Sequence, residues 1–426
     1  MLFDLPVIVA IFMSLGLILV LDKFIRNLSL SILAGTFFLA FLSERSLKEF
    51  ISIPLEKITD KENLMLYFLV WLMIFLSNQI KENNIMGNMT QGLKSRFSGK
   101  TLIASVPIIM GLIPMPGGAL FSAPLVEACD VSGSLDNDSK AKINYWFRHV
   151  WEFWFPLFAA VIMAMQITHL KMWQMALVNL PLSICTVIGG WYFILRKLDM
   201  PSAKPDKSER KPPLFRYLSP IAIIIIGSFI LSFLFPALNS FSKFMSLILS
   251  LIASITVCQL WKPLGAAVWK KMLLAKNGRN MVFIVAIITV YSGFISVPLE
   301  DGRLIIDIMK QELSSVGIPG IILFAVLPFI SGLATGIALG FVGTSFPITY
   351  SLLGASPDLK WVLIMVVLGY GFGLVGTLLS PVHVCNVVTH KYFNTNLFKN
   401  TLSLIKPCGF VAAGAVITAA AVYFMI

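Results

Sequence analysis

The segment NYWFRHVWEFWFP, residues 144–156, places three ionisable side chains among aromatic residues. Arg148, His149 and Glu152 lie in a run that is otherwise apolar, and a charge inside a membrane span costs about 2.5–3.5 kcal/mol on insertion scales. Such residues are functional candidates: Arg148 would attract a carboxylate, and Glu152 or His149 would exchange a proton. Arg148 and Glu152 are four residues apart, so a helix would also allow a purely structural ion pair.

Metal binding is a further interpretation of the same segment, because His149 and Glu152 are three residues apart. No further His or carboxylate stands at ligand spacing, so we predict no metal site. The cysteines are scattered, without a C-x-x-C pair, and are typical of small apolar residues rather than of disulfides or metal ligands. They are Cys129, Cys185, Cys258, Cys385 and Cys408.

The stretch PMPGGALFSAPLVE, residues 114–127, interrupts an apolar segment over 101–128. Its prolines and glycines break a helix, and lipid cannot hydrate the backbone groups that a break exposes. A re-entrant hairpin with its tip in a cavity resolves this conflict, because tip amides and a half-helix N-terminus would bind an anion. The prolines stiffen the tip, the glycines admit a ligand to the backbone and a serine adds a hydroxyl. The predicted contacts are Pro116, Gly117, Gly118 and Ser122.

A second apolar segment, 318–350, is broken in the same way by SGLATGIALGFVGTSFP. Gly332, Gly336 and Gly340 have the small-xxx-small spacing that packs membrane helices together. The same residues would equally form a second hairpin tip that contacts a substrate. On that interpretation the contacts are Thr335, Gly336, Thr344 and Ser345.

The stretch GYGFGLVGTLLSPVHVCN, residues 369–386, contains four glycines before Ser380 and Pro381. The glycines predict unwinding, and the carbonyls freed in this way would coordinate Na+. Alternatively, polar side chains here would contact the substrate, and His383 would be a protonation site or only a satisfied polar residue. The candidate substrate contacts are Thr377, Ser380 and Asn386.

The composition of the chain indicates the class of protein to which these residues belong. The chain has 426 residues, of which 57% are hydrophobic and 13% charged, and its mean hydropathy is +0.86. Soluble domains carry about 25% charged residues, so this is an all-α polytopic membrane protein. The net charge of +12 fits basic cytoplasmic loops and not nucleic-acid binding. No G-x-S-x-G, H-E-x-x-H or paired intramembrane aspartates are present, which argues against an enzyme.

Apolar runs of about 20 residues predict ten crossings, and the two broken segments predict two re-entrant hairpins. The runs are 5–21, 28–43, 64–80, 141–169, 171–195, 217–236, 243–261, 280–297, 359–390 and 401–426. The central loop is rich in Lys and Arg, whereas the loop at 298–316 is acidic on balance. The positive-inside rule then places the central loop in the cytoplasm and both termini outside.

The two halves of the chain share one order of elements. Each has three spans, an amphipathic stretch, a hairpin, an interrupted span and a final span. Prolines bound each hairpin at Pro107 and Pro124, and at Pro328 and Pro347. The loop charges make the first hairpin enter from the cytoplasm and the second from outside, so we predict inverted-topology repeats. The predicted units are 1–195 (hairpin 101–128, interrupted helix 141–169), a basic linker at 196–216, and 217–426 (hairpin 318–350, interrupted helix 359–390).

These motifs, together with SPVHVCNVVTHKYF, resemble the membrane family catalogued as domain of unknown function 401 over nearly the whole chain. That family is similar to the ion transporter superfamily of gluconate, lactate, citrate and C4-dicarboxylate permeases. The resemblance implies a homodimer, an outer scaffold, a mobile unit holding both hairpins and both interrupted spans, and elevator-type alternating access coupled to Na+ or H+. Sodium-dicarboxylate permeases carry Ser-Asn-Thr at their tips, whereas this chain has Met115-Pro116-Gly117 and Leu333-Ala334-Thr335.

The sequence therefore predicts a secondary active transporter of a small organic anion, with a carboxylate as the expected class. Arg148, the tip amides and the hydroxyls would prefer an anion, and His149, Glu152 and His383 are the proton-coupling candidates. No cofactor is expected beyond Na+ or H+ as coupling ion. The alternative is a cation/proton antiporter on the same scaffold, with Glu152 as the exchanging group.

Overall fold

The computed structural model describes residues 5–25, 27–113, 118–130, 133–200, 213–299, 302–316 and 319–425. Pro116, Gly117 and most of the predicted 196–216 linker lie outside these ranges. Within them the chain forms helices joined by turns. Seven helices are long and apolar enough to cross a membrane, and five apolar helices are shorter. The protein is thus a multi-pass helical membrane protein.

The first half contains α1 (Val7–Ile25), α2 (Leu28–Leu42), α3 (Leu47–Thr59), α4 (Lys61–Glu82), α5 (Ile85–Lys94), α6 (Gly99–Gly111), α7 (Ala119–Glu127), α8 (Asn137–Arg148), α9 (Ala159–Thr168) and α10 (Met172–Gly190), which continues as a π-helical turn at Trp191–Leu195. The predicted span 141–169 is therefore two short helices, α8 and α9, separated by ten residues without helical structure.

The second half contains α11 (Leu214–Leu234), α12 (Pro236–Phe241), α13 (Met245–Trp261), α14 (Ala266–Leu273), α15 (Lys276–Ser296), α16 (Ile305–Val316), α17 (Gly320–Thr335), α18 (Ala338–Ser351), α19 (Leu359–Leu379), α20 (Val384–Tyr392), α21 (Leu397–Ser403) and α22 (Ile405–Met425). The predicted span 359–390 is also two helices, α19 and α20, with a break of four residues between them. The linker was predicted too long, because α11 begins at Leu214.

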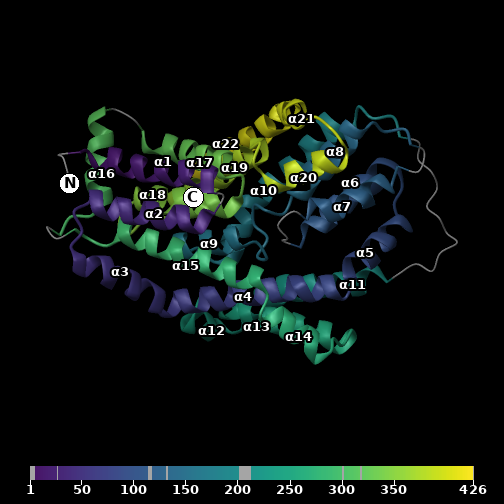
Figure 1. The fold of residues 1–426 in the computed structure, drawn as a ribbon, viewed down its shortest axis with the longest axis horizontal. Helices are drawn as coiled ribbons and strands as arrows, with labels where there is room; N and C mark the ends of the chain where they lie inside the picture. The colour runs from purple at the N-terminus through teal and green to yellow at the C-terminus, as the bar shows by residue number, and fades with distance from the viewer. Residues whose placement is uncertain are drawn as a thin grey trace.

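Both broken apolar segments form helical hairpins. The first hairpin is α6 packed on α7, and the second is α17 packed on α18. The two hairpins lie toward opposite ends of the long axis of the molecule, α6 and α7 near α5 and α8, and α17 and α18 near α1 and α16 (Figure 1).

Burial separates a central set of helices from the periphery. In α19 and α20, 89% of the most apolar window is buried, against 22% in α11 and 28% in α1 and α22. Because α11, α1 and α22 expose apolar side chains over most of their length, they face lipid. α19 packs against α17, α18, α22 and α10, so the second interrupted helix lies at the centre of the fold.

The four glycines of α19 do not unwind it, which corrects the sequence prediction. The helix continues to Leu379 and breaks only at 380–383. The glycines instead allow close packing: a Cβ on Gly373 would lie 2.5 Å from the Phe341 ring, and one on Gly376 would lie 2.2 Å from the carbonyl oxygen of Phe329. Because the backbone carbonyls of the α19 glycines remain within a continuous helix, unwinding does not free them for the predicted Na+ coordination.

A buried ion pair fixes the loop between the first hairpin and α8. Lys140 Nζ lies 3.0 Å from Asp130 Oδ2, and the same carboxylate accepts hydrogen bonds from the backbone amides of Ser134 and Leu135. Burial alone would raise the pKa of Asp130, but the Lys140 and backbone hydrogen bonds outweigh it and hold that pKa below its usual 3.8. The folded state therefore stabilises the ionised form of the Asp130 carboxylate.

We expect Gly332→Ala to destabilise the protein by about 1–3 kcal/mol, because an added methyl overpacks the α17–α19 contact. The new Cβ would lie 2.2 Å from the backbone oxygen of Gly373, which cannot rotate away. The matched control is Gly16→Ala in α1, where nothing lies within 4 Å of the added Cβ and a small gain in helix stability is expected. Thermal melting in detergent measures both, and equal melting temperatures for the two variants would contradict the packing argument.

We expect Asp130→Asn to destabilise the protein by about 3–5 kcal/mol at neutral pH, since Lys140 loses its buried counter-ion. A depressed pKa in the folded state contributes stability above the unfolded pKa of 3.8, and this contribution is lost as pH falls through the lower folded value. The melting difference between wild type and variant should therefore shrink below about pH 4. Glu56→Gln, at an exposed ion pair, is the control and should change little. A difference that stays constant down to pH 2 would refute the assignment.

Candidate functional site

The two interrupted helices meet through a pair of histidines. His149 follows α8, His383 precedes α20, and their Nε2 atoms are 3.0 Å apart. His149 Nδ1 bonds the carbonyl oxygen of Tyr145 at 2.7 Å, and His383 Nδ1 bonds the carbonyl oxygen of Gly336. Both rings are buried. Two sequence-predicted residues that are 234 positions apart are thus brought into direct contact.

The tip of the second hairpin lies against this pair. Gly336 ends α17 with a φ of +65°, in the left-handed region that favours glycine. A Cβ there would lie 2.8 Å from His383 N and 3.0 Å from Ser380 Oγ. The predicted residues Gly336, Ser380 and His383 therefore form one contiguous group, and Thr335 adjoins it along α17.

The first hairpin contacts the segment that carries His149 through the neighbouring residue Arg148. Its Nη1 and Nη2 atoms donate to the carbonyl oxygens of Met110 and Ile113, at 3.2 and 3.5 Å. Arg148 is 4% exposed. The approach is close, because a Cβ on Gly111 would lie 2.1 Å from the Arg148 carbonyl oxygen. Since Arg148 and His149 are adjacent, one short segment contacts the end of α6 and, through His383, the tip of the second hairpin.

The structural ion pair considered for Arg148 and Glu152 does not form. Helix α8 ends at Arg148, so the helical four-residue spacing no longer places the two side chains on one face. Glu152 Oε1 instead lies 3.7 Å from His149 Nε2. The arginine is left to bind the first hairpin and the carboxylate to approach the histidine pair.

A second buried polar group joins the first hairpin to both interrupted helices. Ser122 Oγ, on α7, donates to Asn144 Oδ1 at 2.6 Å. Asn144 Nδ2 donates to the Ala119 carbonyl at 3.1 Å and to Thr389 Oγ1, on α20, at 3.0 Å. The side chains of Ser122, Asn144 and Thr389 are fully buried. The sequence singled out Ser122 but not its partners, since a lone Asn or Thr in an apolar run carries no distinctive signal.

Most of the predicted hydroxyl donors bond their own helices. Thr335, Thr344, Ser345 and Thr377 each donate to the carbonyl four residues earlier, at 2.7, 2.8, 2.5 and 3.0 Å. In this arrangement their oxygens offer lone pairs rather than hydrogens. Asn386 Nδ2 donates to Ser380 O and Thr401 Oγ1, while its buried Oδ1 has no partner within the described ranges.

Four helices lead into the hairpin tips and the interruptions. In each of them, side chains bind carbonyl oxygens of the last turn or of the first residues that follow it. Arg148 binds those of α6, His149 that of Tyr145 in α8, and His383 that of Gly336 after α17. Tyr145 Oη donates to Leu378 O in α19 at 2.9 Å. All four donors come from 145–149 or from His383, so one cluster satisfies acceptors at every break.

The helices that leave the breaks present the opposite arrangement. The N-cap residues of α7, α9, α18 and α20 are Gly118, Phe158, Ile337 and His383, and none of them makes a side-chain capping bond in the described structure. By contrast, Asp136 and Asp358 cap α8 and α19, the first halves of the same interrupted spans. The breaks therefore combine bound carbonyl ends with N-terminal amide ends that no side chain caps, which favours a negative charge nearby.

Cys385 is the functional-site candidate that the sequence prediction missed. Its Sγ and the ring nitrogens of His149 and His383 all lie within 4.8 Å of one another. Cys385 stands two residues after His383, a spacing that is not a metal-binding signature in itself. Only the contact between the two interruptions makes the cysteine part of a cluster.

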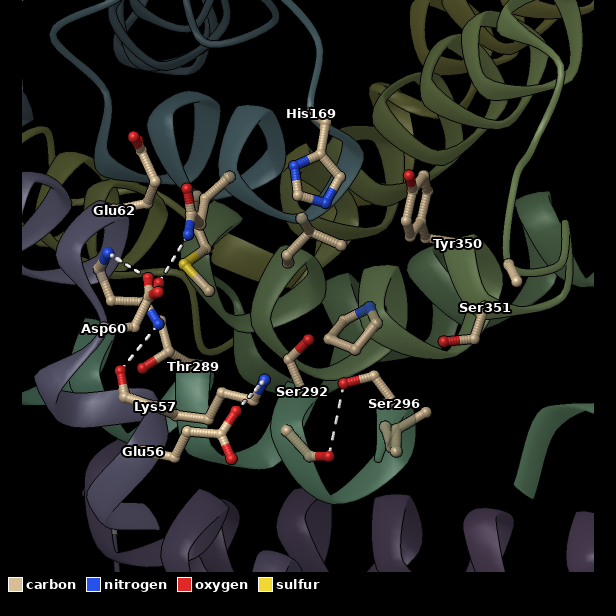
Figure 2. A pocket seen from close by; sticks show the side chains of 18 of the residues that line it. Glu56, Lys57, Asp60, Glu62, His169, Thr289, Ser292, Ser296, Tyr350 and Ser351 are labelled. Atoms are coloured by element: carbon tan, nitrogen blue, oxygen red, sulfur yellow. Dashed lines mark hydrogen bonds and ion pairs between the residues drawn. The ribbon is translucent and has the colours of Figure 1, made fainter. Parts of the chain in front are cut away.

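A polar cavity of about 660 Å³ lies elsewhere, at the foot of the second hairpin. It is bounded by the α3–α4 junction and α15, and across from these by the end of α9 and by α18. Its labelled lining residues are Glu56, Lys57, Asp60, Glu62, His169, Thr289, Ser292, Ser296, Tyr350 and Ser351 (Figure 2). No sequence motif indicates this cavity, because its lining comes from loops and helix ends of both halves. It does not include the histidine pair.

The fold is similar to one known from experiment. It matches the crystal structure of the YdaH transporter of Alcanivorax borkumensis, described as having an unusual topology, with a TM-score of 0.61 over 89% of each chain. The sequence identity is 11%, so the likeness concerns the fold. No curated protein matches the sequence.

The sequence motifs of both hairpins and both interrupted helices therefore lie on a fold similar to that of the YdaH transporter. The family expected from these motifs is confirmed by a family model that matches residues 8–425. The chain belongs to the family described as protein of unknown function DUF401.

Proposed function

We propose that the protein is a secondary active transporter of a small organic anion, with carboxylates as the substrate class. The observation that supports this most strongly is the series of contacts from the end of α6 through Arg148, His149 and His383 to Gly336. It joins two hairpins that lie toward opposite ends of the molecule (Figure 1). Breaks that meet in this way are where alternating-access transporters bind their substrates.

The charge of the site favours an anion. Arg148 is buried, and a guanidinium has more N–H donors than its two hydrogen bonds to carbonyls use. The N-terminal ends of α7, α9, α18 and α20 add partial positive charge at the breaks. A carboxylate between these groups would gain charge-assisted hydrogen bonds, which are about twice as strong as neutral ones.

The architecture that we propose follows the predicted repeats, 1–195 and 217–426, inverted relative to one another. The hairpins and interrupted helices would form the mobile unit, and α4, α11, α13 and α15 would belong to the scaffold. The cavity at the foot of the second hairpin lies between α15 and α18, so it would be the aqueous approach from one face. A homodimer, coupling to Na+ or H+, external termini and a cytoplasmic central loop complete the proposal.

We expect purified protein in liposomes to show saturable, counterflow-competent uptake of one member of a panel of carboxylates and sugar acids. Arg148→Gln should reduce this uptake at least tenfold, since losing a charged hydrogen-bond partner costs about 1.5–3 kcal/mol. The assay measures labelled substrate entry with Na+ and pH gradients varied separately.

The matched control for Arg148→Gln is Arg45→Gln. Arg45 is also a buried arginine bonded to backbone carbonyls, those of Phe294, Val297 and Pro298, but it lies away from the histidine pair. Its loss should lower the melting temperature and leave KM unchanged. Uptake by folded Arg148→Gln equal to that of wild type would overturn the anion site. Cation-driven pH changes without anion uptake would instead identify a cation/proton antiporter.

A further inference from the structure

Hydrogen bonds fix which nitrogen carries the proton on each ring of the histidine pair. The Nδ1 atoms of His149 and His383 face backbone carbonyl oxygens, which only accept, so both Nδ1 atoms must donate. A neutral imidazole has one N–H, so both Nε2 atoms carry lone pairs. These lone pairs face each other at 3.0 Å. Two acceptors at that distance repel, unless a positive species lies between them.

A thiol and a carboxylate lie beside this contact. Cys385 Sγ lies within 4.8 Å of both ring nitrogens, and Glu152 Oε1 lies 3.7 Å from His149 Nε2. His149, His383 and Cys385 are buried, and the Glu152 side chain is 14% exposed. Two imidazoles and a thiol thus converge on one small volume, and a carboxylate lies next to one of the imidazoles.

We propose that His149, His383, Cys385 and Glu152 form a tetrahedral binding site for Zn²⁺. Nitrogen, sulfur and oxygen donors of these types are those that zinc takes in proteins. The ligand set also balances charge, because a thiolate and a carboxylate neutralise the dication in an apolar interior. On binding, the proton of the Cys385 thiol is released to solvent.

The surroundings of the site match those of known zinc ligands. Metal-bound histidines donate their other ring N–H to a carbonyl or carboxylate, which fixes the ring and its tautomer. Tyr145 O and Gly336 O play that part here. A proton shared by the two Nε2 atoms would also relieve their repulsion and attract the Glu152 carboxylate, but it would leave the convergence of Cys385 on both rings unexplained. The metal accounts for the two rings and the thiol together, with Glu152 completing the tetrahedron.

Zinc at this position would bind the end of α8 to the start of α20. Its ligands come in pairs from the two interruptions, 149 and 152 from one, 383 and 385 from the other. The metal would thus hold the interrupted helices as one rigid body, through bonds that do not depend on any transported solute. This inference does not rest on the proposed transport function.

The test begins with wild-type protein purified without chelators. Elemental analysis should find about one zinc per chain, and X-ray absorption should show one sulfur at about 2.3 Å with nitrogen or oxygen neighbours at about 2.0–2.1 Å. These measurements need no variant. Protein that binds no metal at stoichiometric zinc, or a spectrum without a sulfur neighbour, would refute the site and leave a shared proton as the explanation of the histidine contact.

Variants then assign the ligands. Cobalt-loaded wild type should show thiolate-to-Co²⁺ charge-transfer absorption, and Cys385→Ser should lose it and weaken metal binding by roughly a hundredfold or more. Cys258→Ser is the matched control, because Cys258 is buried in α13 and is not part of the cluster, and its spectrum should equal that of wild type. An unchanged cobalt spectrum in Cys385→Ser would overturn the assignment.

Discussion

A break in an apolar helix leaves backbone groups that lipid cannot satisfy, and this chain has four breaks, two between the helices of its hairpins and two in its interrupted spans. Tyr145, Arg148, His149 and His383 bind carbonyls beside all four. All four donors therefore belong to the segment 145–149 or are His383. The hairpins and interrupted helices consequently depend on one another for these hydrogen bonds.

This arrangement has an electrostatic consequence. Side chains bind carbonyls at the helix ends that lead into the breaks, while the helices that leave them lack side-chain caps in the described structure. The buried Arg148 adds a full positive charge beside the first hairpin. A centre organised in this way attracts an anion, whatever its exact identity. The histidines, Cys385 and Glu152 lie where the two interrupted helices touch, so they link the two halves of the chain.

The sequence predicted the elements better than the contacts. Proline and glycine clusters located both hairpins and both interruptions, because those residues act on the local backbone. The prediction that the glycines unwind α19 was wrong, because packing against Phe341 and Phe329 holds that helix intact. The pairing of His149 with His383, the inclusion of Cys385, and the role of Asn144 depend on contacts across more than 200 residues. The spacing of residues along the chain does not predict such contacts.

We propose that the two hairpins enter from opposite faces of the membrane and meet at the interruptions. Single cysteines at Ser98 and Ala128 mark the feet of the first hairpin, and at Pro319 and Ala355 those of the second. The native cysteines are buried or partly buried, so a membrane-impermeant maleimide applied to sealed vesicles reports on the new positions. The account predicts that 98 and 128 react from one side and 319 and 355 from the other. Reaction of 98 and 128 from different sides, or of all four positions from the same side, would contradict it.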